Sequence, residues 1–199
     1  MGHKKEDSKD KSGIYSHLHH RFLEERKLFL WKGIDDKIAE DLVERFFYLE
    51  SIAPGKEITF FVNTPGGSVT AGLSIFDTIR LISSPVTVVV TGLAASMGSI
   101  LLQAPEKGRR FLYPNSQVLI HQPLISGVIR GQASDIEIHA AEMEKTRRVL
   151  TKILSDGSGQ DFEKVYKDCE RDRYLTAQES LDYGLADKII PNLKEFFTA

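Results

Sequence analysis

The chain has 199 residues, of which 41% are hydrophobic and 27% are charged, a composition typical of a globular protein with one well-filled core. Its 26 Lys and Arg residues are balanced by 28 Asp and Glu residues, so the formal net charge is -2 and we expect no nucleic-acid partner, because such binders carry a basic surplus. The single cysteine, Cys169, excludes an internal disulfide and is typical of a reducing compartment, so we expect a cytoplasmic protein.

The sequence predicts a charged tail at residues 1–13, followed by one domain at 14–199. Seven of the eight residues at 4–11 are charged, with both signs mixed, and such a stretch cannot bury apolar surface. The chain starts with no apolar leader, and no apolar run approaches the roughly 20 residues that cross a bilayer. The rest of the chain contains no repeat and no linker rich in Pro, Gly or Ser. We therefore expect a single domain and no membrane partner.

From residue 27 onward, short apolar runs alternate with amphipathic segments. The apolar runs predict buried strands at 28–31, 58–62, 86–90, 118–120 and 187–190. Apolar residues at helical spacing predict helices after Asp35 and Ser68, at 100–102, and from Ser134 to about Leu154. A capping box predicts a last helix that starts at Thr176, with Gly184 at its end. Strands that alternate with helices predict an α/β fold with mostly parallel strands.

Ser96 is the first candidate for chemistry, because it follows the β-branched strand at 86–90 and begins a helix. Small residues two positions before and after it, Ala94 and Gly98, allow the tight strand-to-helix turn that exposes a nucleophilic hydroxyl. Backbone N–H groups at such a helix start can also stabilise negative charge. The residues alone leave a second interpretation open, in which the small residues only pack the helix close to the sheet.

Gly66 and Gly67 form a similar strand-to-helix junction about thirty residues earlier. Glycine lets a backbone N–H approach a ligand oxygen without an intervening side chain. Two such junctions at the same sheet edge would supply two donors to one oxyanion. An ordinary tight turn explains the pair equally well.

A serine nucleophile needs a base, which is usually histidine. His121 directly follows the predicted strand at 118–120, where side chains reach the sheet edge. A histidine that is buried and satisfied in the core is the alternative. The histidines at 17, 19 and 20 lie in a polar segment with no further Cys or carboxylate spacing for a metal, and His139 lies on the long helix, where we expect it to serve packing.

A carboxylate would hold the imidazole in the right tautomer. Asp172 lies in the charged run at 170–173, for which a surface ion-pair cluster is the alternative interpretation. The residues alone thus indicate a serine hydrolase among several open interpretations.

Six motifs resemble those of the ClpP serine peptidases, in order and over most of the chain. They are NTPGGSV at 63–69, TGLAASMGS at 91–99, PNS at 114–116, HQP at 121–123, GQA at 131–133 and ERDR at 170–173. The resemblance implies a serine peptidase with Ser96 as nucleophile, His121 as general base and Asp172 as the residue that orients it. It also implies an oxyanion hole formed by the backbone N–H groups of Gly67 and Met97.

The same resemblance implies a crotonase-like domain built from ββα units, with a projecting handle at about 124–158. Substrate is then expected to pair as an extended strand with one ribbon of the handle, whose residues are Leu124, Ile125, Ser126, Gly127 and Val128.

Assembly and partners are likewise implied by the resemblance. Two seven-membered rings are expected to stack, either as one kind of subunit or mixed with a second ClpP paralogue, with Glu170 and Arg171 coupling the rings. An AAA+ unfoldase of the ClpX, ClpA or ClpC type is expected to dock at Phe61, Leu81 and Phe111 and to deliver unfolded polypeptides. The chain has no phosphate-binding loop, so we expect ATP to be used by the unfoldase. We also expect no cofactor and no metal in this chain.

Two alternative functions remain open at this point. One is a structural subunit, or one that is active only in a mixed ring. The other is an acyl-CoA enzyme of the crotonase type, which would share the Gly66–Gly67 device without needing a nucleophilic Ser96.

Overall fold

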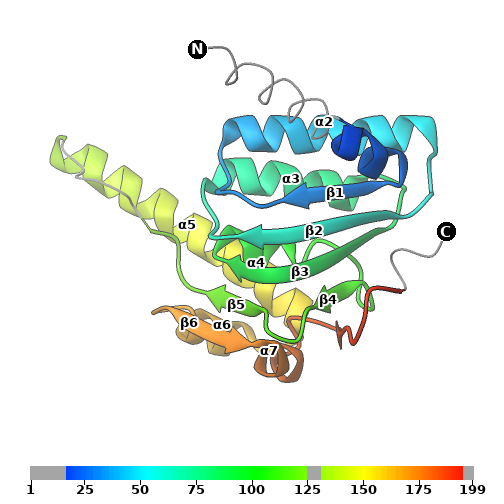
Figure 1. Cartoon of the computed structure of the whole chain (residues 1–199). Coiled ribbons are helices and arrows are strands. Elements are labelled where there is room, and N and C mark those ends of the chain that lie inside the picture. The colour runs from blue at the N-terminus through cyan, green and yellow to red at the C-terminus, as the bar shows by residue number, and fades with distance from the viewer. Residues whose placement is uncertain (1–16, 125–130, 195–199) are drawn as a thin grey trace, which may run out of the picture.

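The computed structural model describes residues 17–124 and 131–194, which form a mixed α/β fold around one sheet (Figure 1). In these residues the strands are β1 (Lys27–Leu30), β2 (Ile58–Thr64), β3 (Val86–Ala95), β4 (Arg110–Leu112), β5 (Gln117–Ile120), β6 (Arg173–Thr176) and β7 (Lys188–Ile189). The helices are α2 (Asp36–Ile52), α3 (Val69–Leu81), α4 (Met97–Leu101), α5 (Ala133–Ser158), α6 (Phe162–Asp168) and α7 (Ala177–Tyr183), and residues 17–24 are also helical.

Parallel pairing dominates the sheet, as the alternation of strands and helices predicted. Its order is β1-β2-β3-β4-β7, while β5 pairs with β3 and carries β6 on its other side. Every pair is parallel except β5 with β6, which is antiparallel. The central strand β3 is buried throughout its β-branched half, from Val86 to Val90, as expected for a strand covered on both faces. The α/β prediction is therefore confirmed.

Helices α2 and α3 begin where their capping residues predicted. The Asp35 carboxylate accepts a hydrogen bond from the Ile38 N–H at 2.8 Å, and the Ser68 hydroxyl accepts one from the Ala71 N–H at 3.4 Å. Each helix then buries one apolar stripe in the main core, with Phe46 and Ile75 fully buried. In α2 the residues that face this core include Ile38, Leu42 and Leu49.

The strand β3 is longer than predicted and changes the geometry before Ser96. The sequence predicted a strand at 86–90, but the strand continues to Ala95. Its last residues pair on both sides, since Ala94 is in register with Thr64 of β2 and with Val118 of β5. This two-sided pairing keeps the chain extended up to the residue before Ser96. The short strands β4 and β6 were not predicted.

Helix α5 projects away from the rest of the molecule (Figure 1). Its buried residues, Leu150, Thr151 and Leu154, all lie in its last third. Towards its start, Ile136 and Ile138 are 43% and 61% exposed, and His139 is exposed too. The packing role predicted for His139 is therefore not met within the single chain.

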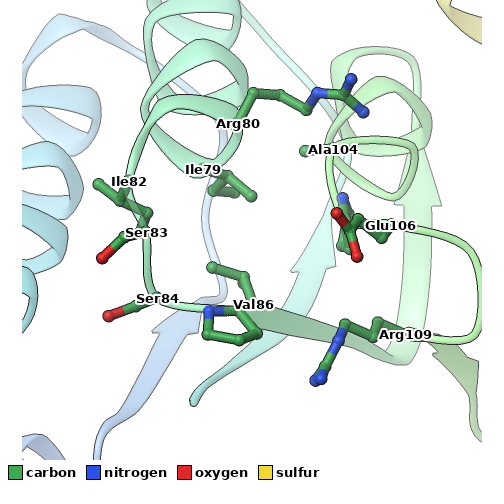
Figure 2. A pocket seen from close by; sticks show the side chains of 11 residues that line it. Ile79, Arg80, Ile82, Ser83, Ser84, Val86, Ala104, Glu106 and Arg109 are labelled. Carbon is green, nitrogen blue, oxygen red and sulfur yellow. The ribbon is translucent and has the colours of Figure 1, made fainter. Parts of the chain in front are cut away.

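A pocket of about 210 Å³ lies beside the first residues of β3, between the ends of α3 and α4 (Figure 2). Its walls combine apolar side chains such as Ile79 and Ala104 with charged residues that include Arg80, Glu106 and Arg109. It lies at the opposite end of β3 from Ser96. Among the described helices, none is both long enough and apolar enough to cross a membrane.

Candidate active site

The carboxyl ends of β3 and β5 bring Ser96 and His121 to the same edge of the sheet. The two strands are parallel neighbours, with Ala95 in register with Leu119. Ser96 follows β3, and its N–H donates a hydrogen bond to the Leu119 carbonyl at 3.0 Å. His121 follows the end of β5. Polar side chains at the carboxyl ends of neighbouring parallel strands are the usual position of an α/β site.

Ser96 has a backbone conformation that is rare for a residue with a side chain. Its φ is 54° and its ψ is -118°, directly before the start of α4 at Met97. A positive φ costs a non-glycine residue about 1–2 kcal/mol, and such strain concentrates at functional turns. The Ser96 carbonyl accepts hydrogen bonds from the Ser99 N–H at 2.9 Å and the Ser99 hydroxyl at 2.6 Å, which hold the turn. The tight turn predicted at Ser96 is present.

Gly66 packs directly against this turn, a role that the sequence did not reveal. Its φ is +92°, and a Cβ built there would lie 2.7 Å from both the Ala95 carbonyl oxygen and the Ser96 Cβ. The Thr64 hydroxyl accepts a hydrogen bond from the Gly66 N–H at 3.1 Å, which fixes this backbone. A glycine is therefore required here so that the two strand-to-helix junctions can touch.

The backbone N–H groups of Gly67 and Met97 are the predicted oxyanion donors. Ile34 forms a parallel β-bridge with Gly67. The Ile34 N–H donates to the Gly66 carbonyl and the Ile34 carbonyl accepts from the Ser68 N–H, each at 2.8 Å. In a parallel bridge these two bonds lie on one side, so the Gly67 N–H is directed away from Ile34. Met97 is the first residue of α4, where an N–H has no acceptor within its own helix. Both groups are thus able to bind a ligand oxygen.

His121 and Asp172 face each other beyond the end of an antiparallel ladder. The last pair of β5 and β6 is Ile120 with Arg173, and because the strands are antiparallel, His121 after β5 lies opposite Asp172 before β6. The His121 Nδ1 lies 3.0 Å from the Asp172 Oδ1. The imidazole is 12% exposed, whereas the carboxylate is 60% exposed. Within the described residues the Ser96 hydroxyl makes no hydrogen bond with His121, and catalytic hydrogen bonds of this kind often tighten only when substrate binds.

Gln122 holds the two segments together next to His121, and sequence reasoning assigned it no role. Its N–H donates to the Cys169 carbonyl at 2.6 Å, and its side-chain Nε2 donates to the Glu170 carbonyl at 2.9 Å. The position of Gln122 directly after His121 in the HQP motif was the only signal in the sequence. The segment that leads to Asp172 is therefore fastened to the segment that carries His121.

The thiol of Cys169 lies close to this site but is no rival nucleophile. Burial is the main cause that raises its pKa to about 11, and the charge of Asp168 acts in the same direction. A thiol with such a pKa stays protonated near neutral pH, and the thiolate is the reactive form. The candidate nucleophile at this edge remains Ser96.

The predicted substrate ribbon and the predicted ring-coupling pair lie away from the turn at Ser96 in the sequence. Leu124 is 70% exposed at the end of a described segment, and the remaining ribbon positions, 125–128, lie outside the described residues. Glu170 and Arg171 are exposed beside Asp172.

The three positions predicted for unfoldase docking do not meet within one chain. Phe61 and Phe111 lie on the same face of the sheet, in the small cluster around Val89. Leu81 is 83% exposed at the end of α3, a helix that covers the other face. Within one chain, therefore, only Phe61 and Phe111 lie on the same face of the sheet, and Phe61 is buried there.

A groove of about 630 Å³ reaches Gly67, and its other walls come from the segment between β1 and α2 and the first turns of α2. It reaches Gly67 from the side of Ile34, away from which the Gly67 N–H is directed, and its walls do not include Ser96, Met97 or His121. Among the described residues there is no group of three or more His, Cys, Asp or Glu side chains that could hold a metal ion.

Comparison with known proteins identifies the family of the chain. The Clp protease family model matches residues 9–193. The ATP-dependent Clp protease proteolytic subunit 1 of Protochlamydia amoebophila (strain UWE25) is 46% identical over 193 residues, which cover 97% of this chain and 94% of that protein. The chain therefore belongs to the Clp protease family, and it is a serine peptidase.

Proposed function

We propose that the chain is an endopeptidase in which Ser96, His121 and Asp172 form the catalytic triad. The observation that carries the proposal is the 3.0 Å contact between His121 and Asp172 at the sheet edge where the strained Ser96 directly precedes α4. Membership of the Clp protease family supports peptide-bond cleavage as the reaction.

In the proposed mechanism, the Ser96 Oγ attacks the scissile carbonyl carbon while the His121 Nε2 takes the hydroxyl proton. The negative oxygen of the tetrahedral intermediate binds the N–H groups of Gly67 and Met97, each worth about 3 kcal/mol if it acts like other oxyanion donors. His121 then gives its proton to the leaving amine, and the acyl group stays on Ser96. Water repeats the sequence and frees the enzyme, while Asp172 stabilises the imidazolium in both halves.

We further propose that substrate binds as an extended strand along the segment 124–128. Pairing through backbone hydrogen bonds is tolerant of side chains, which suits unfolded polypeptides as substrates.

Assembly into two stacked seven-membered rings, with this chain alone or together with a ClpP paralogue, is part of the proposal. The exposed Ile136 and Ile138 on the projecting part of α5 are the kind of apolar surface that a second subunit would cover. Glu170 and Arg171 are proposed to couple the rings.

An AAA+ unfoldase is proposed to supply the ATP-driven step. It would dock where Phe61 and Phe111 of one subunit meet Leu81 of its neighbour, since these residues lie on opposite faces of the sheet in a single chain. Cytoplasmic localisation stays a prediction.

Covalent labelling with a fluorophosphonate tests the triad directly, because an activated serine displaces fluoride from phosphorus and the intact mass rises. We expect one label per wild-type chain, none in Ser96→Ala, and full labelling of the control Ser51→Ala, an exposed serine of α2. Labelling of Ser96→Ala at the wild-type rate would contradict the assignment. Absence of labelling in the wild type, alone and with a paralogue or unfoldase, would count against Ser96 as an activated nucleophile and favour a structural role for this chain in a ring.

A further inference from the structure

The segment from Asp168 to Arg173 forms a loop whose two ends are joined by an ion pair. The Arg173 Nη1 lies 2.5 Å from the Asp168 Oδ1. Asp168 is the last residue of α6, and Arg173 is the first residue of β6. The proposed orienting residue, Asp172, lies inside this loop, immediately before its closing residue.

Asp172 itself has little to hold it in place. Its carboxylate is 60% exposed, and in the described part of the chain its side-chain partner is His121. An exposed carboxylate gains little from a single ion pair and has several rotamers open to it. The direction of the Asp172 side chain towards His121 therefore depends on the backbone conformation of Asp172. The next residue, Arg173, holds that backbone because it pairs with Ile120 in the β5–β6 ladder.

Asp168 is held far more firmly than Asp172. Its Oδ2 accepts hydrogen bonds from the Tyr183 hydroxyl of α7 at 2.7 Å and from the Lys164 Nζ of α6 at 3.1 Å. The Asp168 carboxylate is 20% exposed, and Tyr183 as a whole is 6% exposed. Burial on its own would raise the pKa of Asp168, but the Tyr183 and Lys164 hydrogen bonds and the charges of Arg173 and Lys164 outweigh it and lower the pKa. Three donors from three elements thus fix one ionised carboxylate.

We propose that Asp168 is a positioning residue of the peptidase, which acts through Arg173 to hold the Asp172 carboxylate against His121. The inference rests on the proposed triad. Asp168 touches none of the reacting atoms, so its loss is expected to lower kcat and to leave substrate binding unchanged. It also links α6 and α7, which lie outside the sheet, to the proposed site.

Kinetics of an Asp168→Asn variant test this role, with Asp182→Asn as the matched control. Asp182 lies on α7, is exposed, and accepts one hydrogen bond from Gln178, so its replacement makes the same chemical change away from the loop. With a fluorogenic peptide, we expect Asp168→Asn to lower kcat by roughly 10- to 100-fold, the scale of a misplaced catalytic group, while KM stays unchanged. Asp168→Glu should recover part of the loss, and Asp182→Asn should behave as wild type. Sedimentation of each variant checks that the assembly is unaltered.

The double variant Asp168→Asn/Asp172→Asn separates positioning from a general structural role. If Asp168 acts through Asp172, the double variant should be no slower than Asp172→Asn alone. Losses that multiply, or a kcat of Asp168→Asn equal to that of Asp182→Asn, would overturn the inference and leave the triad intact. Wild-type kcat in Asp172→Asn would instead remove the proposed triad and the inference with it. If Asp168→Asn does not assemble, Tyr183→Phe removes one of its donors and should lower kcat several-fold with the same lack of additivity.

Discussion

Replacement of Gly66 by alanine should inactivate the enzyme by displacing Ser96. The new Cβ would lie 2.7 Å from the Ser96 Cβ, whereas ordinary contacts of this kind begin near 3.4 Å, so the two junctions must separate by about 0.7 Å. The other atom at this distance is the Ala95 carbonyl oxygen, and neither a backbone atom nor a Cβ can rotate away. A misplacement of this size at a catalytic group costs roughly 100-fold in rate. The positive φ of +92° adds about 1–2 kcal/mol of strain, which affects stability.

Gly108→Ala is a close control for this prediction. Gly108 has a φ of +93°, but nothing lies within 4 Å of a Cβ built there, so alanine meets the same strain without the collision. The rate constant of fluorophosphonate labelling and kcat for a peptide should both fall in Gly66→Ala and stay at the wild-type value in Gly108→Ala. Equal activity of the two variants, at equal concentration of assembled protein, would refute the steric argument.

Three further predictions concern stability and assembly. Arg110→Met should lower the free energy of unfolding by about 3–5 kcal/mol, because it strands the Asp187 carboxylate that the buried guanidinium contacts at 2.5 and 2.9 Å; a urea titration that shows less than about 1 kcal/mol would contradict this. Hydrogen bonds from Ser83 and Ser84 lower the pKa of Glu50 to about 2, so its stabilising contribution should be present above about pH 4.5 and be lost as pH falls towards 2. In chemical unfolding, the difference in free energy of unfolding between wild type and Glu50→Gln should therefore shrink over that range. Arg171→Ala should weaken ring stacking, and an unchanged mass distribution in sedimentation would speak against it.

Much of the fold could be predicted from local sequence patterns. Long β-branched or amphipathic runs with a capping residue, such as the helix after Asp35, leave few alternatives. The strands β4 and β6 escaped because each is short and carries an arginine. Arg110 is paired with Asp187, far along the chain, and Arg173 is paired with Asp168 at the end of another element. The extension of β3 beyond Gly92 depends on pairing with β2 and β5, which no local pattern records.

Part of the candidate site could likewise be predicted from the sequence, and part could not. Ser96, His121 and Asp172 were identified because their motifs are contiguous and resemble those of a known family. The contacts of Gly66 and Asp168 depend on which segments meet in space, and a single glycine or aspartate in a sequence carries no sign of its neighbour. Steric fit and ion-pair closure therefore had to come from the structure.

Helix α5 is attached to the rest of the chain at one end only, so a small rotation there would move its free end much further. With 26 residues at 1.5 Å rise, the helix is about 39 Å long, and only its last third is buried. The Gly157 carbonyl near that end accepts a hydrogen bond from Arg110 at 2.8 Å, so the attached end is fixed to the sheet. A tilt of about 5° at this end would move the other end of the helix, about 25 Å away, by roughly 2 Å. Even a small change in packing around Arg110 would therefore displace the tip of α5 by the length of a hydrogen bond.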